Sequence, residues 1–463
     1  MTQLHDLTAL EQGDAVRRGE VSPRELAAHY LGRADDVGAF VTRTPELALE
    51  RAASLPPPAA DAGPLYGVPT AIKDLNLTAG IRTTFGSAAF ADFVPDVSDA
   101  VTEAVERAGM VSLGKTSTPE FGSPCYTEPE GLPPAVTPWD RTRMAGGSSG
   151  GAAAAVAAGL VPVAQGSDGG GSIRIPASCC GLVGLKPTRG RVSGYPMYGE
   201  VTGLATAGTL ARTVRDAAAL LDVLAGPRVG DPSWAPPPDS AFLAMCEREP
   251  GRLRVARFVE PVIADAEVDP ECVAAWESAS SLLTSLGHDV EDVAVPMPRE
   301  AVATFETCWA VLTALSVVPP EQEPLLRPLT RWLSARGRAV SGPEFGLALG
   351  AMRRYAAACL VALAPYDVVL TPTLAVPPLP VGSLRDDADP AADFEAQKAF
   401  TPWTSAWNVT GMPAVSLPLH RTPEGLPVGV MLAARPVEED VLLAVSAQVE
   451  AAAPWADRHP PGW

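Results

Sequence analysis

The sequence predicts an α/β fold in which a mixed, twisted β-sheet is flanked by helices on both faces. Two observations predict it. Apolar strand-like segments alternate with helix-like segments along most of the chain, a pattern typical of strands joined by helical crossovers. Residues 415–420 and 426–435 instead flank a turn at residues 422–425, which predicts an antiparallel hairpin. Crossovers and a hairpin in one chain indicate a sheet of mixed direction.

Two regions differ in character. Residues 1–60 are predicted to form an N-terminal helical segment, in which Ser22 followed by Pro23 is typical of a helix start. A proline-rich stretch at residues 55–64 ends this segment. Residues 61–463 are predicted to form a single large α/β domain.

The first strands of that domain lead up to two serine-containing loops. One strand is expected to end at Lys73, and the alanine-rich residues 150–159 predict a helix followed by a strand at 160–165. Such a helix rises about 13 Å and such a strand returns about 20 Å. The chain from Ser148 to Ser172 can therefore fold back and bring both serines to one edge of the sheet. Open α/β sheets usually place their sites at that edge.

Further elements are predicted from capping residues and apolar runs. A second proline-rich break, at residues 230–238, separates them into two groups. Before this break, a helix is predicted at 99–108 and a strand at 110–114. After it, strands are predicted at 252–259, 289–295 and 366–372, a helix between Asp269 and Gly287, and a final helix at 438–452.

Composition argues against several classes of protein. A net charge of −19 repels phosphate backbones, so nucleic acid is not expected as a partner. There is no run of 18 apolar residues and no signal peptide, so no association with a membrane is expected. Seven cysteines without a secretory signal predict reduced thiols and a cytoplasmic protein.

The first candidate site is the run Gly169, Gly170 and Gly171 before Ser172. Consecutive glycines allow successive N–H groups to point at one spot. Amide hydrolysis needs such donors, because negative charge builds on the carbonyl oxygen in the tetrahedral intermediate. A flexible turn and a phosphate-binding loop are alternative interpretations. No Gly-Lys-Ser or Gly-Lys-Thr follows, which argues against the phosphate loop.

The second candidate is Ser148, within residues 146–150. This segment matches the G-x-S-x-G nucleophile elbow of α/β-hydrolases. That elbow should follow an apolar strand, yet the preceding residues 138–144 are polar. It would also need a histidine, and none of the five histidines lies close in sequence to either glycine cluster. A loop at the start of a helix is the alternative interpretation.

The third candidate is Lys73, one of only four lysines in the chain. Its apolar neighbours predict a buried stem, and burial lowers the pKa of a lysine towards values at which the amine is neutral. A neutral amine can act as a general base where no histidine is available. An ion pair with Asp74 or Asp168 is the alternative.

Together the three residues suggest one catalytic device. Lys73 would take a proton from Ser148, which would take one from Ser172, whose oxygen then attacks a carbonyl carbon. The flanking glycines would allow an unusual peptide geometry at Ser148, such as a cis bond. This predicts amide hydrolysis through an acyl-enzyme. No His/Cys/Asp cluster has the spacing of metal ligands, so neither a metal nor another cofactor is expected.

The sequence resembles the amidase signature hydrolases. The resemblance rests on GVPTAIKDLN, AGGSSGG and GSDGGGSIRIPASCCGLVGLKPTRG, and it continues into ARTVRDAAALLDVLAGP, YDVVLTPTLAVPP and NVTGMPAVSLPL. It implies that Ser172 is the nucleophile, Ser148 a proton shuttle in a cis peptide, and Lys73 the base. It also implies oxyanion donors from the backbone of residues 169–172.

The same resemblance implies supporting residues and a substrate. Asp168 and Arg174 look like the family's polar pair beside the nucleophile, and Ser149 belongs to the same set. The motifs are most similar to those of 6-aminohexanoate cyclic dimer hydrolases, which implies a small linear, cyclic or aryl amide as substrate. The alternative is the amidase subunit of a tRNA-dependent amidotransferase, which shares this signature. Because the family often forms homodimers, the resemblance allows a homodimer.

Substrate contacts are predicted only by position. Cys125 and Tyr126 lie between Lys73 and Ser148 in sequence, which makes them candidates for the pocket wall. Cys308 is a further candidate, on an apolar helix. Ordinary packing is the alternative for each of these residues. The chain departs from the family pattern at Ala152 and at residues 132–139, which affects the expected pocket but not the triad.

Overall fold

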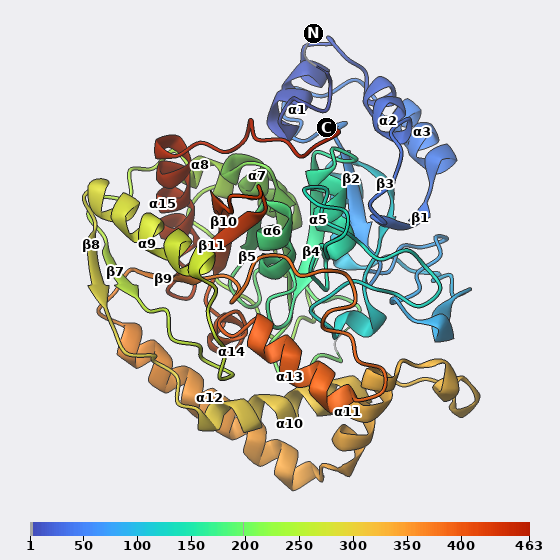
Figure 1. The fold of residues 1–463 in the computed structure, drawn as a ribbon. Helices are drawn as coiled ribbons and strands as arrows, with labels where there is room; N and C mark the ends of the chain where they lie inside the picture. The colour runs from blue at the N-terminus through green and yellow to red at the C-terminus, as the bar shows by residue number, and fades with distance from the viewer. Residues whose placement is uncertain (1–2, 198) are drawn as a thin grey trace.

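The structure is a computed structural model, and it describes residues 3–197 and 199–463. Two sheets lie at its centre: a three-stranded sheet in the order β1-β3-β2 and an eight-stranded sheet in the order β4-β6-β5-β10-β11-β9-β7-β8 (Figure 1). The strands are β1 (Phe40–Arg43), β2 (Pro69–Lys73), β3 (Val111–Thr116), β4 (Val163–Asp168), β5 (Val183–Lys186), β6 (Thr206–Ala211), β7 (Arg254–Arg257), β8 (Asp289–Asp292), β9 (Val368–Pro372), β10 (Ala414–Arg421) and β11 (Pro427–Ala434).

Helices surround both sheets. Figure 1 shows α1 to α3 at the N-terminal end of the molecule and α10 to α12 as a separate layer below the large sheet. The helices are α1 (Ala9–Arg17), α2 (Pro23–Leu31), α3 (Pro45–Ser54), η1 (Ala88–Phe90), α4 (Ala100–Arg107), η2 (Glu120–Gly122), α5 (Gly150–Ala157), α6 (Arg174–Cys180), α7 (Val214–Leu224), α8 (Phe242–Met245), α9 (Pro270–Ser285), α10 (Glu300–Ala314), η3 (Pro320–Leu325), α11 (Pro328–Ala339), α12 (Gly342–Leu363), α13 (Pro390–Phe400), α14 (Ala406–Thr410) and α15 (Glu439–Ala452).

The large sheet is mixed, as predicted. β7 runs parallel to β8 and to β9, whereas β10 pairs antiparallel with β5 and with β11. The β10–β11 pair is the predicted hairpin. Successive residues of β11 point to opposite faces. Val430 and Leu432 belong to a core cluster with residues of α7, α9 and α15, whereas Met431 and Ala433 belong to a cluster with residues of α10, α12 and α14. Helices therefore cover both faces, and the predicted fold class is confirmed.

Capping side chains placed several helix starts correctly. The Asp99 carboxylate accepts a hydrogen bond from the N–H of Thr102, and the Asp269 carboxylate accepts one from Glu271. The Ser22 hydroxyl forms a capping box with Glu25 at the start of α2. Strand positions were less exact: β4 begins three residues later than predicted, and β5 and β6 were not predicted at all.

The N-terminal segment is not purely helical. It also supplies β1, which pairs antiparallel with β3. β1 has only four residues, all partly exposed, so its sequence carries no strong strand signal. Its formation depends on hydrogen bonds to β3, a partner about 70 residues further along the chain.

The two sheets meet where the site is formed. The Thr70 hydroxyl of β2 donates to the carbonyl oxygen of Val163 in β4 at 3.0 Å. The N–H of Lys73 donates to the side-chain oxygen of Gln165 in β4, also at 3.0 Å. These contacts hold β2, which ends at Lys73, alongside the first half of β4.

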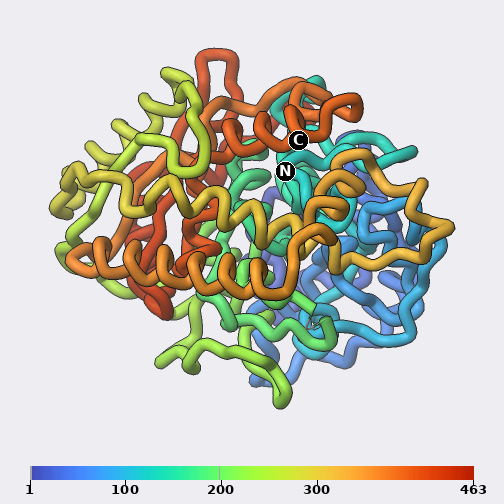
Figure 2. The backbone as a smooth tube through the Cα atoms, turned by 90° about the horizontal axis from the view of Figure 1, so that it is seen from below, coloured from blue at the N-terminus to red at the C-terminus, as the bar shows by residue number. Residues whose placement is uncertain are grey.

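α10 and α12 run side by side across the lower face of the molecule (Figure 2). In the described residues α12 is the one helix long and apolar enough to cross a membrane by length and composition, and only 17% of its 18-residue window is buried. It carries the consecutive arginines Arg353 and Arg354 and packs against α10 and α14.

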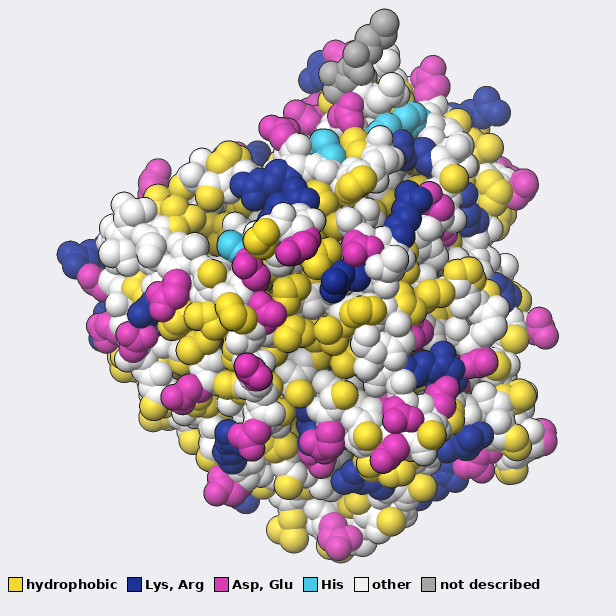
Figure 3. All heavy atoms as spheres, in the orientation of Figure 1, with side chains coloured by type: hydrophobic (Ala, Val, Ile, Leu, Met, Phe, Trp, Pro, Cys, Tyr) yellow, Lys and Arg dark blue, Asp and Glu magenta, His cyan; other side chains and the backbone are white. Residues whose placement is uncertain are grey.

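The surface carries charges of both signs. Figure 3 shows Asp and Glu side chains spread over the face in view, with Lys and Arg side chains between them and no large continuous basic area. Many of these charges are paired, as in the ion pair of Arg257 with Asp292 at 2.8 Å. That nucleic acid is not a partner stays a prediction.

Candidate active site

Lys73 ends β2 with its side chain completely buried. Its ammonium nitrogen donates to the hydroxyl of Ser148 at 2.8 Å and to the hydroxyl of Ser167 at 3.0 Å. Neither Asp74 nor Asp168 forms an ion pair with Lys73 among the described residues. Asp74 instead pairs with Lys115 at 3.3 Å. The ion-pair interpretation of Lys73 is therefore not what the structure shows.

Burial lowers the pKa of Lys73 to about 7, because a charged ammonium loses its hydration in the interior. The negative charge of Asp168 opposes this effect without cancelling it. A substantial fraction of Lys73 is then a neutral amine near pH 7. Its nitrogen can accept the proton of the hydroxyl that it contacts.

Ser148 and Ser149 form the turn that leads into α5. The peptide bond between Gly147 and Ser148 is cis. Ser149 ties this turn to β4: its hydroxyl donates to the carbonyl oxygen of Ser167 at 3.1 Å and accepts from the N–H of Ser167 at 3.2 Å. The backbone N–H of Ser149 also donates to the carbonyl oxygen of Ser172 at 3.1 Å. Ser149 therefore joins the two serine-containing loops.

Gly122 is a site residue that sequence reasoning did not single out. A Cβ atom at Gly122 would lie 3.2 Å from the Ser148 hydroxyl oxygen, and its φ of +67° is in the left-handed region. A side chain here would be strained and would crowd the Ser148 hydroxyl. The only available signal was the glycine itself, in the segment FGSPCYT.

Ser172 lies between β4 and α6 and is 7% exposed. Its hydroxyl makes no hydrogen bond to Ser148 or to Lys73 among the described residues. The Ser172 loop is joined to Ser148 instead through the backbone bond from Ser149. The structure therefore shows the first contact of the predicted relay, Lys73 to Ser148, and not the second, Ser148 to Ser172.

We call residues 168–172 the glycine loop. Within the described residues, the N–H groups of Gly169, Gly170 and Ser172 have no acceptor. The N–H of Gly171 is different, because it donates to the Asp168 carboxylate at 2.8 Å. The prediction that Gly171 supplies an oxyanion donor is therefore corrected, because its N–H is already used. The N–H groups of Gly169, Gly170 and Ser172 remain.

Asp168 and Arg174 form a fully buried pair beside the nucleophile. Two guanidinium nitrogens of Arg174 donate to the two carboxylate oxygens of Asp168, each at 2.9 Å. Burial alone would raise the pKa of Asp168, but the charge and hydrogen bonds of Arg174 outweigh it and hold that pKa well below its usual value. Asp168 is therefore a permanent carboxylate that also organises the start of α6 by accepting the N–H of Ile173 at 3.2 Å.

Cys125 and Tyr126 lie beside the Ser148 loop by their backbone. A Cβ atom at Gly147 would lie 2.8 Å from backbone atoms of Tyr126, so this contact requires glycine. Both residues are buried, and the Tyr126 hydroxyl donates to Asp393 at 2.6 Å. This hydroxyl is already engaged within the protein. The role that the structure supports for these two residues is packing against Gly147.

Cys308 is completely buried in the core between α10, α12 and α14. Two neighbours on α10, Phe305 and Trp309, are the residues that face the site. A Cβ atom at Gly169 or Gly170 would lie 3.7 Å from the Trp309 indole. The rings of Phe305 and Trp309 stack with centroids 5.4 Å apart. Sequence reasoning did not single out Phe305 and Trp309, because it could not tell which face of α10 meets the glycine loop. That Cys308 contacts the substrate stays a prediction.

No group of three or more His, Cys, Asp or Glu side chains within residues 3–197 and 199–463 is arranged to hold a metal ion. The site described above consists instead of hydroxyls, one amine and backbone N–H groups. This set can transfer protons and stabilise negative charge on an oxygen.

Known proteins share this arrangement of the chain. The amidase family model matches residues 25–443. A 6-aminohexanoate-cyclic-dimer hydrolase from Paenarthrobacter ureafaciens is 38% identical, covering 98% of this chain and 96% of the relative. A solved 6-aminohexanoate cyclic dimer hydrolase with bound substrate superposes with a TM-score of 0.92 at 34% identity, covering 99% of both chains. The A subunit of a glutamyl-tRNA(Gln) amidotransferase from Synechococcus is 36% identical, covering 96% of both chains.

These matches extend over nearly the whole chain and include every motif of the site. The fold, the two serine-containing loops and the buried lysine occur together in one structure. The chain therefore belongs to the amidase signature family, and it is an amidase.

Proposed function

We propose that this amidase hydrolyses small-molecule carboxamides, with Ser172 as the nucleophile, Ser148 as the proton shuttle and Lys73 as the base. The observation that carries the proposal is the 2.8 Å contact between the Lys73 nitrogen and the Ser148 hydroxyl. A buried lysine whose pKa is about 7 is suited to accept that proton at neutral pH.

The acylation step follows from these contacts. Lys73 accepts the Ser148 proton, Ser148 accepts the Ser172 proton, and the Ser172 oxygen bonds to the amide carbon. The electron pair of the C=O bond moves to its oxygen, next to the free N–H groups of the glycine loop. When the C=O bond re-forms, the C–N bond breaks, and the leaving nitrogen receives the proton held by Lys73 through Ser148.

Deacylation repeats the same transfers with water. A water molecule loses a proton to Lys73 through Ser148 and attacks the ester carbon. The carboxylic acid leaves, and its departure returns the proton to Ser172. The relay needs a Ser148–Ser172 contact that forms by rotation of the Ser172 side chain, and such contacts often tighten only when substrate is bound.

The walls of the site support an apolar or aromatic substrate. The stacked rings of Phe305 and Trp309 lie over Gly169 and Gly170, and both residues are only partly buried. The indole N–H of Trp309 donates to the Ser123 hydroxyl at 3.2 Å, which holds the ring in place. A flat aromatic group next to the scissile carbonyl would stack on this surface.

A first prediction tests this wall. Trp309→Ala is expected to raise the KM for an amide with an aromatic acyl group by about 3- to 10-fold, because an aromatic contact of this kind contributes roughly 0.5–1.5 kcal/mol. The KM for a short aliphatic amide should change much less. Steady-state kinetics on both substrates give the ratio. Trp234→Ala serves as the control, since Trp234 is an exposed tryptophan outside α10. Equal changes for both substrates would contradict the assignment.

The function itself is tested by a substrate panel. Linear, cyclic and aryl amides are incubated with the purified protein, and released amine is measured. Hydrolysis without a partner protein supports the proposal. If activity instead requires co-purified subunits, glutamine and tRNA, the chain is the amidase subunit of an amidotransferase, the candidate favoured by its 36% identity to such a subunit.

We also propose that the enzyme works in the cytoplasm as a homodimer, without nucleic acid or membrane partners. All seven cysteines are free and buried, which fits a reducing compartment. Light scattering of the purified protein tests the dimer.

A further inference from the structure

We propose that Thr404 is a positioning residue that sets the orientation of the glycine loop's N–H groups for catalysis. The inference rests on the proposed function, because it assigns those N–H groups to the carbonyl oxygen of the amide. Thr404 lies just before α14, far from the loop in sequence, and it is completely buried. No motif identified in the sequence includes it.

The peptide unit between Gly170 and Gly171 is held at both ends. The Thr404 hydroxyl donates to the carbonyl oxygen of Gly170 at 2.6 Å. On the opposite side of the same unit, the N–H of Gly171 donates to the Asp168 carboxylate at 2.8 Å. The C=O and N–H of a trans peptide point in opposite directions. These two bonds therefore fix the rotation of this unit about the chain.

Arg174 links Thr404 to Asp168 through hydrogen bonds. It donates to the carbonyl oxygen of Thr404 at 2.8 Å and to the Asp168 carboxylate at 2.9 Å. Thr404 is thus anchored by the same guanidinium that anchors Asp168. Because Thr404 is held in place, the loss of its hydroxyl would alter the orientation of the Gly170–Gly171 peptide unit.

Asn408, on α14, holds the neighbouring peptide unit, between Asp168 and Gly169. Its amide nitrogen donates to the backbone carbonyl of Asp168 at 2.9 Å, while its side-chain oxygen accepts from Arg174 at 2.7 Å. The unit that carries the Gly169 N–H is therefore also fixed. With these units fixed, the N–H groups of Gly169, Gly170 and Ser172 are the ones left for a substrate.

Thr404 and Gly171 are matched in shape. A Cβ atom at Gly171 would lie 2.4 Å from the Thr404 hydroxyl oxygen, and the φ of Gly171 is +134°. The side chain of Thr404 occupies the space that glycine leaves. Because Gly171 has no Cβ atom, the Thr404 hydroxyl can reach the Gly170 carbonyl.

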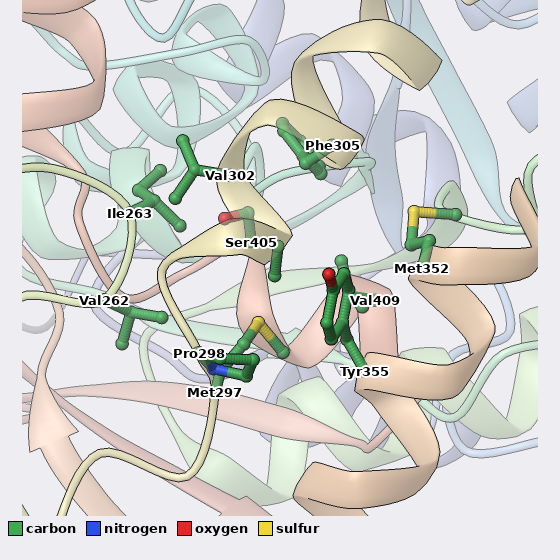
Figure 4. Close-up of a pocket in the computed structure, with 11 residues that line it drawn as sticks. Val262, Ile263, Met297, Pro298, Val302, Phe305, Met352, Tyr355, Ser405 and Val409 are labelled. Carbon is green, nitrogen blue, oxygen red and sulfur yellow. The ribbon is translucent and has the colours of Figure 1, made fainter. Parts of the chain in front are cut away.

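The other face of α14 belongs to the core cluster that also contains residues of α10 and α12, and it borders an apolar pocket. Figure 4 shows Ser405 and Val409 among side chains of α10 and α12, including Phe305 and Met352. Ala406 and Val409 pack in this cluster, which supports α14 on the side away from the glycine loop. Thr404 is therefore presented to Gly170 by a rigid support.

The test compares three variants of the purified enzyme on a small aryl amide. Thr404→Val keeps the shape and removes the hydroxyl, and it is expected to lower kcat by about 10- to 100-fold, below the effect of deleting an oxyanion donor outright. KM should change less than about twofold, because the loss falls on the transition state. Thr404→Ser restores the hydroxyl and should recover kcat to within about threefold of the parent.

Thr410→Val is the matched control. It makes the same chemical change on α14, the helix that Thr404 precedes, but the Thr410 hydroxyl donates only to the carbonyl of Ala406 within that helix. Its kcat is expected to stay near that of the parent. Affinity for a trifluoromethyl ketone analogue, whose oxygen occupies the oxyanion position, should fall in Thr404→Val in parallel with kcat.

Three outcomes overturn the inference. They are full kcat in Thr404→Val, an equal loss of kcat in Thr410→Val, or a loss in Thr404→Val that Thr404→Ser does not rescue. All three leave the proposed function standing if Ser172→Ala is inactive in the same assay. Undiminished turnover by Ser172→Ala would instead refute the proposed function, and with it the basis of this inference.

Discussion

Ser172→Ala is expected to lower kcat for amide hydrolysis by about 10⁶-fold, the scale seen when a serine hydrolase loses its nucleophile. The alanine cannot form the acyl-enzyme, while the free N–H groups of the glycine loop stay in place. Binding of substrate should therefore persist, with KM close to that of the parent. Amine release under saturating substrate measures the effect.

Labelling gives an independent readout of the same residue. A fluorophosphonate probe should modify the parent at Ser172 and leave Ser172→Ala unlabelled. Ser285→Ala is a suitable control, because Ser285 lies at the exposed end of α9 and its hydroxyl donates only to the carbonyl of Leu282. Retained turnover in Ser172→Ala, or labelling at another serine, would remove Ser172 from its proposed role.

The second large effect is expected at Lys73. Lys73→Arg should lower kcat by about 10²- to 10⁴-fold, the range typical of lost general-base catalysis. A guanidinium stays protonated at every accessible pH, so it cannot accept the Ser148 proton. Circular dichroism and thermal unfolding of the variant check that the fold is retained.

The parent enzyme should show a matching pH dependence. Burial disfavours the charged form of Lys73 and lowers its pKa to about 7, so the active neutral amine dominates above that pH. Activity should rise with pH up to about 7 and then level off. At pH 5 it is expected to be about 100-fold lower than at pH 9, since protonation costs tenfold per unit below the pKa.

Lys186 provides the control for this pH profile. Burial also lowers its pKa to about 7, yet its nitrogen donates to the carbonyl of Pro187 and contacts neither serine. Lys186→Met should therefore show the same rise of activity with pH, up to about pH 7, as the parent. Loss of that rise in Lys186→Met would assign the titration to Lys186 and contradict the role proposed for Lys73.

Much of the fold was predictable from local signals. Asp99 and Asp269 marked the starts of α4 and α9, and the β10–β11 hairpin followed from its turn. An apolar helix was expected around Cys308, but the bounds of α10 were not, because α10 has no side-chain capping bond. α11 also lacks such a bond and was not predicted at all. α12 did carry a usable signal, the capping box of Ser341 and Glu344.

The sequence by itself determined the chemistry available to this protein. The glycines, the paired serines and a lysine among apolar residues identify a hydrolase site without histidine, because residue type sets which protons can move. The sequence also identified Asp168 and Arg174 as neighbours of the nucleophile.

Tertiary structure alone decided which of these groups are free to act. The N–H of Gly171 is used by Asp168, Trp309 faces the glycine loop, and Thr404 reaches Gly170 from a segment distant in sequence. These facts depend on hydrogen bonds and packing between segments distant in sequence. Such contacts have no local signature, because each partner alone is compatible with many other environments.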